Sequence, residues 1–171
     1  MKTTQHFGLL YVMAAIVQII ICNYFHLSAY ITLSILPAMI LCIPMKVGTV
    51  PAMLIAFGSG LAVDALAEGL IGLNALAAVP VAFFRKPLVR LIFGEDVIER
   101  EGSISFRKYG PLKISAAVLV VQAVFLAIYI MADGAGTRPF WFNAARFGAS
   151  VAAGWALSMV TAGVLLPDDK K

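Results

Sequence analysis

Long apolar runs alternate with short breaks of glycine, proline or charge along the 171 residues of the chain. A helix needs about 20 apolar residues to cross the hydrocarbon core of a bilayer, and most of these runs approach that length. The pattern predicts one domain of six transmembrane helices, with a mixed-charge loop at 94–110 between the fourth and the fifth. The expected helices cover residues 7–22, 28–43, 49–67, 72–93, 111–132 and 140–166. The first two runs are short, so the pattern leaves open whether they form regular helices.

The composition indicates that lipid is the solvent of this protein. The chain is 61% hydrophobic and 13% charged, and its mean hydropathy is +0.94. An average soluble domain is about 25% charged, because its surface must be hydrated. We therefore expect an all-α integral membrane protein. The two cysteines, Cys22 and Cys42, fall in different apolar runs and toward opposite membrane faces, so no disulfide is expected.

Lys and Arg residues gather on one side of the expected bundle. If the N-terminus is cytoplasmic, only Arg138 and Arg146 of the 13 basic residues face outward. Short cytoplasmic loops are enriched in Lys and Arg, so this distribution predicts that both termini are cytoplasmic. The loop 94–110 is interpreted either as a solvated connection or as a docking surface for a partner or anionic lipid. The residues expected to anchor the cytoplasmic helix ends are Arg85, Lys86, Arg90, Arg107 and Lys108.

Small residues recur at four-residue steps in the third and sixth apolar runs. Residues four apart share one helix face, and small side chains let helices approach closely in lipid. We therefore expect both helices to pack inside the bundle through these faces. The expected packing residues are Ala52, Ala56, Gly58, Gly60, Gly72, Ala144, Gly148, Ala152 and Ala156.

Asp64 is the only acidic residue well inside an apolar run. A carboxylate in hydrocarbon is costly unless a partner neutralises it, so a partner should lie at the same depth. Asn74 and Arg146 share that depth near the outer leaflet. We expect Asp64, Asn74 and Arg146 to form an outer-leaflet polar cluster that locks three helices together. The alternative is that Asp64 reaches water at the helix end.

Catalytic chemistry is not favoured by the sequence. Ser59, between two glycines, is weakly similar to an intramembrane serine nucleophile, which requires a base. The two histidines, His6 and His26, lie at a chain end and in a loop rather than on another membrane helix. Aspartyl proteolysis in the membrane requires two acids, and only Asp64 is suitably placed. We expect a non-enzymatic protein with no cofactor, no metal site and no nucleic-acid partner.

The residues from Phe57 to Leu76 carry a family resemblance. A glycine-rich helix ends in Gly-Leu-Ala-Val-Asp at 60–64, and after a short turn the chain continues with Gly-Leu-Asn-Ala at 72–75. This pattern resembles the MreD family of rod-shape-determining membrane proteins, especially its forms in Bacteroidetes-type bacteria. The flanks are similar too, with Lys2 near the start and Pro37 in the second run. The fourth run ends as in that family, with Arg85, Pro87 and Arg90.

The resemblance implies a non-catalytic scaffold in the bacterial inner (cytoplasmic) membrane. MreD proteins belong to the elongation machinery, which organises lateral peptidoglycan synthesis and cell shape. They bind MreC, which has one membrane crossing, and act through it with MreB filaments, RodA and a transpeptidase. The sequence leaves open which helix face binds the partner and whether the protein forms a homo-oligomer.

The resemblance also implies a second candidate function. The MreD fold is thought to be similar to the substrate-binding S components of energy-coupling-factor transporters. A subunit that binds a vitamin or another small molecule is therefore the alternative. Asp64, Asn74 and Arg146 would then contribute to an outward ligand cavity, and whether a ligand or lipid occupies that cluster stays open. The short outer connections argue against it, and so does Gln18, which stands where a small residue of the coupling motif is expected.

Overall fold

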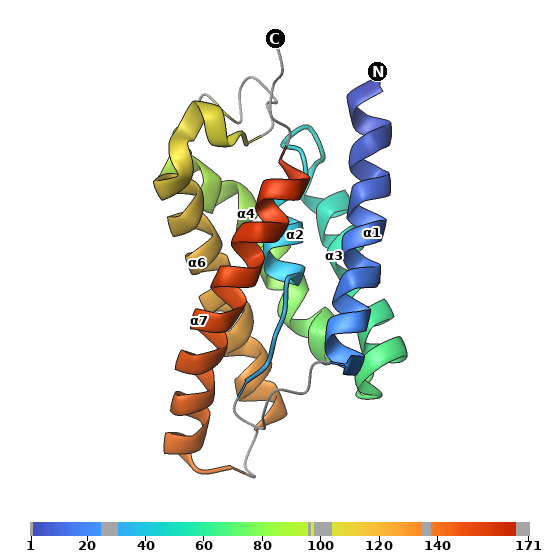
Figure 1. The fold of residues 1–171 in the computed structure, drawn as a ribbon, viewed down its shortest axis with the longest axis vertical. Coiled ribbons are helices and arrows are strands. Elements are labelled where there is room, and N and C mark those ends of the chain that lie inside the picture. Colours follow the sequence, from blue (N-terminus) through green and yellow to red (C-terminus); the bar gives the residue numbers. More distant parts are fainter. Residues whose placement is uncertain (1, 25–30, 96, 98–103, 135–137, 167–171) are drawn as a thin grey trace.

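The computed structural model describes residues 2–24, 31–95, 97, 104–134 and 138–166. Every regular element in these ranges is a helix, which confirms the all-α character predicted from the sequence. Figure 1 shows the long helices running side by side in one bundle. The elements are α1 (Lys2–Tyr24), α2 (Leu36–Cys42), α3 (Thr49–Val63), the π-helix η1 (Asp64–Glu68), α4 (Leu73–Phe93), α6 (Phe106–Asp133) and α7 (Phe140–Leu165).

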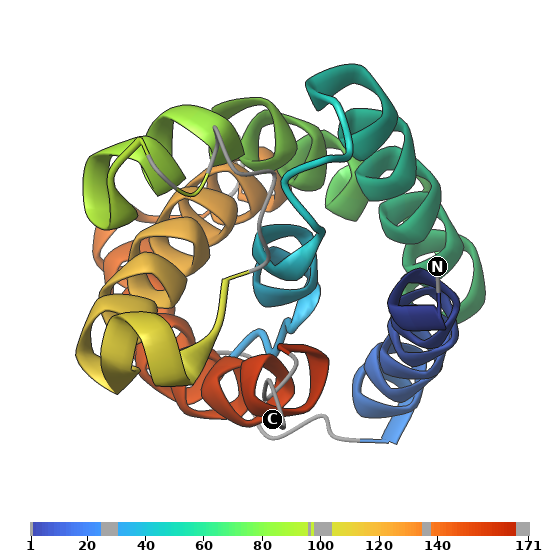
Figure 2. The same ribbon diagram turned by 90° about the horizontal axis from the view of Figure 1, so that it is seen from above.

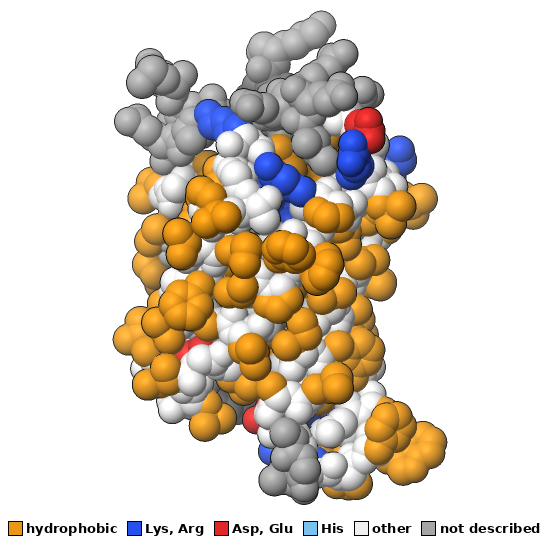
Figure 3. All heavy atoms as spheres, turned by 180° about the vertical axis from the view of Figure 1, so that it is seen from behind, with side chains coloured by type: hydrophobic (Ala, Val, Ile, Leu, Met, Phe, Trp, Pro, Cys, Tyr) orange, Lys and Arg blue, Asp and Glu red, His pale blue; other side chains and the backbone are white. Residues whose placement is uncertain are grey.

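Four helical stretches are long and apolar enough to cross a membrane, which indicates a membrane protein. They are Phe7–Tyr24, Thr49–Ala67, Lys108–Asp133 and Phe140–Leu165. Large hydrophobic side chains on these stretches are exposed, as lipid contact requires and water contact would penalise. Figure 3 shows hydrophobic side chains over the body of one face of the bundle, with most of the Lys and Arg side chains on that face near its upper end. Examples of the exposed side chains are Leu9, Val12, Leu54, Leu119 and Val160.

The short helix α2 lies at the centre of the bundle. Seen from above, the other helices surround it (Figure 2), and α2 contacts α1, α3, α4, α6 and α7. All of its residues are buried, and Leu36, Met39 and Ile40 are among the largest fully buried side chains of the protein. The hydrophobic core is therefore organised around α2, and the long helices form its wall.

The second apolar run is not a continuous helix. Residues 31–35, here called the central segment, are non-helical and lead into α2, and Pro37 occupies the first turn of that helix. Proline is tolerated there because the first amides of a helix have no partner within it. The irregularity that the sequence left open thus lies in the second run, whereas α1 is helical along its whole length.

Close packing of α3 against α4 depends on one glycine. Ala52, Ala56 and Gly60 are buried along one face of α3, as expected from their spacing. A Cβ added at Gly60 would lie 2.7 Å from the backbone of Ala75 on α4, so no larger residue fits without displacing that backbone. Gly72 lies in the turn with φ +103°, a left-handed conformation that favours glycine.

The small-residue faces predicted at Gly58 and along the sixth run do not pack inside the bundle. Gly58 is exposed, and an added Cβ there would meet no atom within 4 Å. The α7 residues expected inside are all exposed, namely Ala144, Gly148, Ala152 and Ala156. The buried face of α7 is displaced by two residues from the predicted one and consists of Arg146, Ser150, Gly154, Ser158 and Ala162. The prediction for α7 is wrong because the polar residues of this helix, rather than its smallest ones, must turn away from lipid.

Gly60→Leu is expected to destabilise the protein, because its side chain would force α4 away from α3. Overpacking of a core typically costs about 1–3 kcal/mol, so the unfolding temperature in detergent should fall by several degrees. Gly58→Leu is the control on the same helix. Its side chain enters open space and leucine favours helix over glycine, so stability should be unchanged or higher. Equal losses in both variants would contradict the close contact.

Candidate functional site

The central segment carries backbone groups that no helical ladder satisfies. Lipid offers them no hydrogen-bond partner, so side chains of the surrounding helices must do so. Gln18 of α1 uses both ends of its amide: Oε1 accepts the Ile35 N–H at 2.7 Å, and Nε2 donates to the Leu33 carbonyl at 3.2 Å. From α6, Gln122 Nε2 donates to the Ser34 carbonyl at 3.1 Å. Both glutamines are fully buried, so they belong to the interior of the fold.

Helix α7 completes this network with residues spaced four apart. Ser150 Oγ accepts the backbone N–H of Thr32 at 2.8 Å. One turn further, a Cβ at Gly154 would lie 2.2 Å from Gln122 Nε2, so glycine leaves the room that this amide occupies. Ser158 Oγ donates to Gln122 Oε1 at 3.1 Å, which orients the amide with its nitrogen toward the central segment. The buried face of α7 therefore serves the central segment along several turns.

An ion pair closes the network at the end where α6 leads into α7. Arg146 of α7 pairs with Asp133 at the end of α6, and both side chains are largely buried. The guanidinium also donates from Nε and from its second terminal nitrogen to Thr32 Oγ1, at 3.1 and 2.9 Å. The Tyr129 ring lies 6.0 Å from the guanidinium carbon. Arg146 thus ties α6, α7 and the central segment together.

Asp64 is the hydrogen-bond acceptor at the start of α4. It is fully buried, and its carboxylate accepts the N–H groups of Gly72 at 2.9 Å, Asn74 at 2.9 Å and Ala75 at 3.2 Å. The Asn74 side-chain amide donates to the same carboxylate at 2.9 Å. The first amides of a helix lack partners within it and carry partial positive charge. Asp64 therefore acts as a cap for α4, supplied from η1 in place of the side chain that the N-cap residue Gly72 lacks.

The structure brings together two of the three residues of the expected outer-leaflet cluster. Asp64 and Asn74 are bonded to each other, whereas Arg146 pairs with Asp133. The expected pairing of Asp64 with Arg146 is wrong, because the amides of α4 already satisfy the carboxylate. The alternative that Asp64 reaches water is also wrong, since its exposed fraction is 0%.

The expected basic anchors divide into exposed and buried residues. Arg85 is 1% exposed and donates to the carbonyls of Ile43, at the end of α2, and Val47, the second at 3.0 Å. Its assignment as a surface anchor is wrong, because the last carbonyls of a buried helix require donors. Lys86 is half-buried, Arg90 and Lys108 are exposed, and the Arg107 side chain lies outside the described residues.

Most of the buried polar side chains hold backbone and helices in place. Among the described residues, the buried atoms without a hydrogen-bond partner are Ser34 Oγ, Arg85 Nε, Ser105 Oγ and Asn143 Oδ1. Gln18, Gln122, Ser150 and Arg146 hold the central segment, and Arg85 holds the end of α2. Within the described ranges, no three His, Cys, Asp or Glu side chains are grouped as a metal site requires. The contacts of these buried residues therefore fix the central segment and α2 against the surrounding helices.

Sequence reasoning missed the glutamines and serines of this network. An isolated Gln inside an apolar run is the same kind of signal as Asp64, since a polar side chain in lipid requires a partner. Gln18 and Gln122 could have been found in this way. Their target was harder to find, because Pro37 in the run 28–43 is compatible with a kinked membrane helix as well as with a helix that begins there.

No family model matches the chain, and no curated protein or solved structure is similar enough to count as a match. The resemblance to MreD therefore depends on the residues between Phe57 and Leu76. These residues form one unit, in which Gly60 permits the approach of α4 and Asp64 caps its first turn.

A charge exchange between Asp133 and Arg146 is expected to restore stability. Each single variant, Asp133→Arg or Arg146→Asp, leaves two like charges together and should lose roughly 3–5 kcal/mol, the usual cost of breaking a buried pair. The double variant should recover a large part of that loss in unfolding measured in detergent. Asp64→Arg combined with Arg146→Asp is the control and should show no recovery. A rescue in the control pair instead would contradict the observed pairing.

Proposed function

We propose that this protein is a non-catalytic, MreD-like scaffold of the bacterial elongation machinery in the inner membrane. The observation that carries the proposal is the geometry of the segment that resembles MreD. Gly60, Asp64, Gly72 and Asn74 each have a distinct physical task in joining α3 to α4. A pattern whose members depend on one another in this way is a better family signature than four unrelated residues would be.

The proposed topology has six crossings with both termini in the cytoplasm. The start of α1 and the end of α7 lie at the same end of the bundle (Figure 1), where Lys and Arg side chains gather (Figure 3). The second crossing combines the central segment with α2. Five non-helical residues reach at most about 17 Å and seven helical ones add about 10 Å, close to the hydrocarbon thickness of about 30 Å. The fourth crossing is α4, whose basic second half approaches the cytoplasmic surface.

The proposed partner is the single membrane helix of MreC. Small residues let two helices approach closely in lipid, and α7 exposes four of them at four-residue steps. The protein itself leaves this face uncovered: Ala144, Gly148, Ala152 and Ala156 are exposed, and an added Cβ at Gly148 would meet no atom within 4 Å. Through MreC, the scaffold would connect to MreB, RodA and a transpeptidase.

The transporter-subunit alternative has less support. It needs polar groups that converge on an outward cavity. Asp64 and Asn74 bond to each other and to the start of α4, while Arg146 is engaged by Asp133 and Thr32. A surface pocket of about 520 Å³ beside Asp133 is lined mainly by apolar residues such as Leu70 and Leu76. These residues suit a protein or lipid contact better than a polar vitamin.

Co-purification with MreC in mild detergent tests this function. Wild-type protein should retain MreC through gel filtration. Gly148→Leu should lose most of the bound MreC while keeping its own unfolding temperature, because the new side chain points into open space. Gly58→Leu, also exposed but on α3, is the control and should retain it. Absence of any complex between the two folded wild-type proteins would overturn the proposal.

A further inference from the structure

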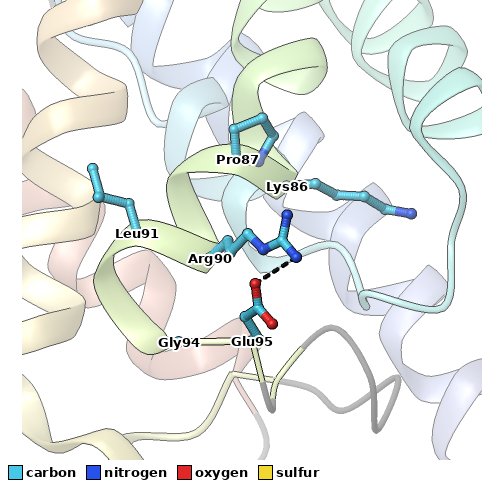
Figure 4. Close-up of a pocket in the computed structure, with 6 residues that line it drawn as sticks. All are labelled: Lys86, Pro87, Arg90, Leu91, Gly94 and Glu95. Atoms are coloured by element: carbon cyan, nitrogen blue, oxygen red, sulfur yellow. Dashed lines mark ion pairs between the residues drawn. The ribbon is translucent and has the colours of Figure 1, made fainter.

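A pocket of about 660 Å³ opens at the end of α4, lined by Lys86, Pro87, Arg90, Leu91, Gly94 and Glu95. Its volume is in the range that small ligands occupy. Lys86 and Arg90 are four residues apart, so they lie on one helix face. Figure 4 shows their side chains extending to the same side of α4, away from Leu91. The pocket thus presents two cationic groups beside an apolar wall.

The two cationic groups are available to a ligand. The pair of Arg90 with Glu95, at 2.5 Å, has both side chains about 60% exposed. Exposed pairs of this kind are worth little, so an anion that contacts both Arg90 and Lys86 can replace the carboxylate. Among the described residues, Lys86 has no ion-pair partner. Neighbouring Arg85 does not compete, because it is turned inward onto the carbonyls of Ile43 and Val47.

The position of the pocket indicates the class of ligand. Phe83 and Phe84, one turn before Lys86, are half exposed, and Leu91 is 87% exposed. Exposed aromatic and aliphatic side chains belong beside acyl chains, and Lys and Arg near a helix end reach the headgroup level. The change from apolar to cationic surface therefore occurs within this pocket.

We infer that the pocket binds the phosphate group of an anionic phospholipid, with Lys86 and Arg90 as phosphate ligands and Leu91 and Pro87 against an acyl chain. A free phosphate compound is also an anion that Lys86 and Arg90 can bind, but it makes no use of the exposed apolar wall. Glu95 pairs with Arg90, so the phosphate would replace this carboxylate on binding. The inference requires a membrane location but does not depend on the scaffold function.

Native mass spectrometry of the delipidated full chain can test the site, with phosphatidylglycerol and phosphatidylcholine of identical acyl chains as probes. Wild-type protein should prefer phosphatidylglycerol. Lys86→Gln with Arg90→Gln should weaken its binding by about thirtyfold, since each basic residue at an anionic surface contributes about fivefold. Lys108→Gln with Lys113→Gln removes the same charge from exposed residues outside the pocket and should change binding less than threefold.

Glu95→Gln distinguishes lipid binding from a purely structural role of these residues, because only lipid binding predicts a gain in affinity. It frees Arg90 from its carboxylate, so phosphatidylglycerol should bind several-fold more tightly. Glycerol phosphate, which lacks acyl chains, should not displace the lipid at equal concentration. Equal weakening in the two double variants, no headgroup preference in the wild type, weaker binding after Glu95→Gln, or displacement by glycerol phosphate would each overturn the inference.

Discussion

The fold depends on satisfying the backbone of a segment that is not helical at the centre of a membrane bundle. A backbone N–H or carbonyl without a partner costs several kcal/mol in lipid, so a break in a membrane helix survives only where protein groups replace its hydrogen bonds. The central segment receives these bonds from Gln18, Gln122 and Ser150, which come from α1, α6 and α7. Arg85 of α4 donates to the carbonyl of Ile43, at the end of α2, and to that of Val47. The four helices α1, α4, α6 and α7 are therefore fixed by polar contacts to the central segment or to the end of α2.

This constraint also explains which surfaces remain free. The buried face of α7 is occupied by residues that serve the central segment, so its stripe of alanine and glycine turns outward. In the same way, Asp64 is fully used in capping α4, and Arg146 is used in joining α6, α7 and Thr32. Because most of the buried polar side chains bond to groups inside the bundle, the small-residue face of α7 stays exposed.

The sequence predicted the all-α character and the inward face of α3, because hydrophobic periodicity and size follow local rules. It identified Asp64 as a residue that needs partners, but it assigned Arg146 on depth alone. Depth alone does not distinguish Arg146 from the backbone amides of Gly72 and Ala75 as partners of Asp64. Every residue except proline carries a backbone amide, so the pattern of side chains does not show which amides lie nearby. The burial of Arg85 was missed for the same reason: its partners are the carbonyls of Ile43 and Val47. These carbonyls can be predicted as hydrogen-bond partners only when it is known that the helix of the second run is interrupted.

Amide hydrogen exchange of the full protein in lipid nanodiscs tests the central claim directly. Gln18→Leu removes the acceptor of the Ile35 N–H, whereas Val17→Leu changes the adjacent, lipid-exposed position of α1. The loss of one buried hydrogen bond, about 1–1.5 kcal/mol, should make the Ile35 amide exchange roughly tenfold faster in Gln18→Leu. Val17→Leu should leave that rate unchanged. Equal protection of Ile35 in the wild type and in Gln18→Leu would contradict the account.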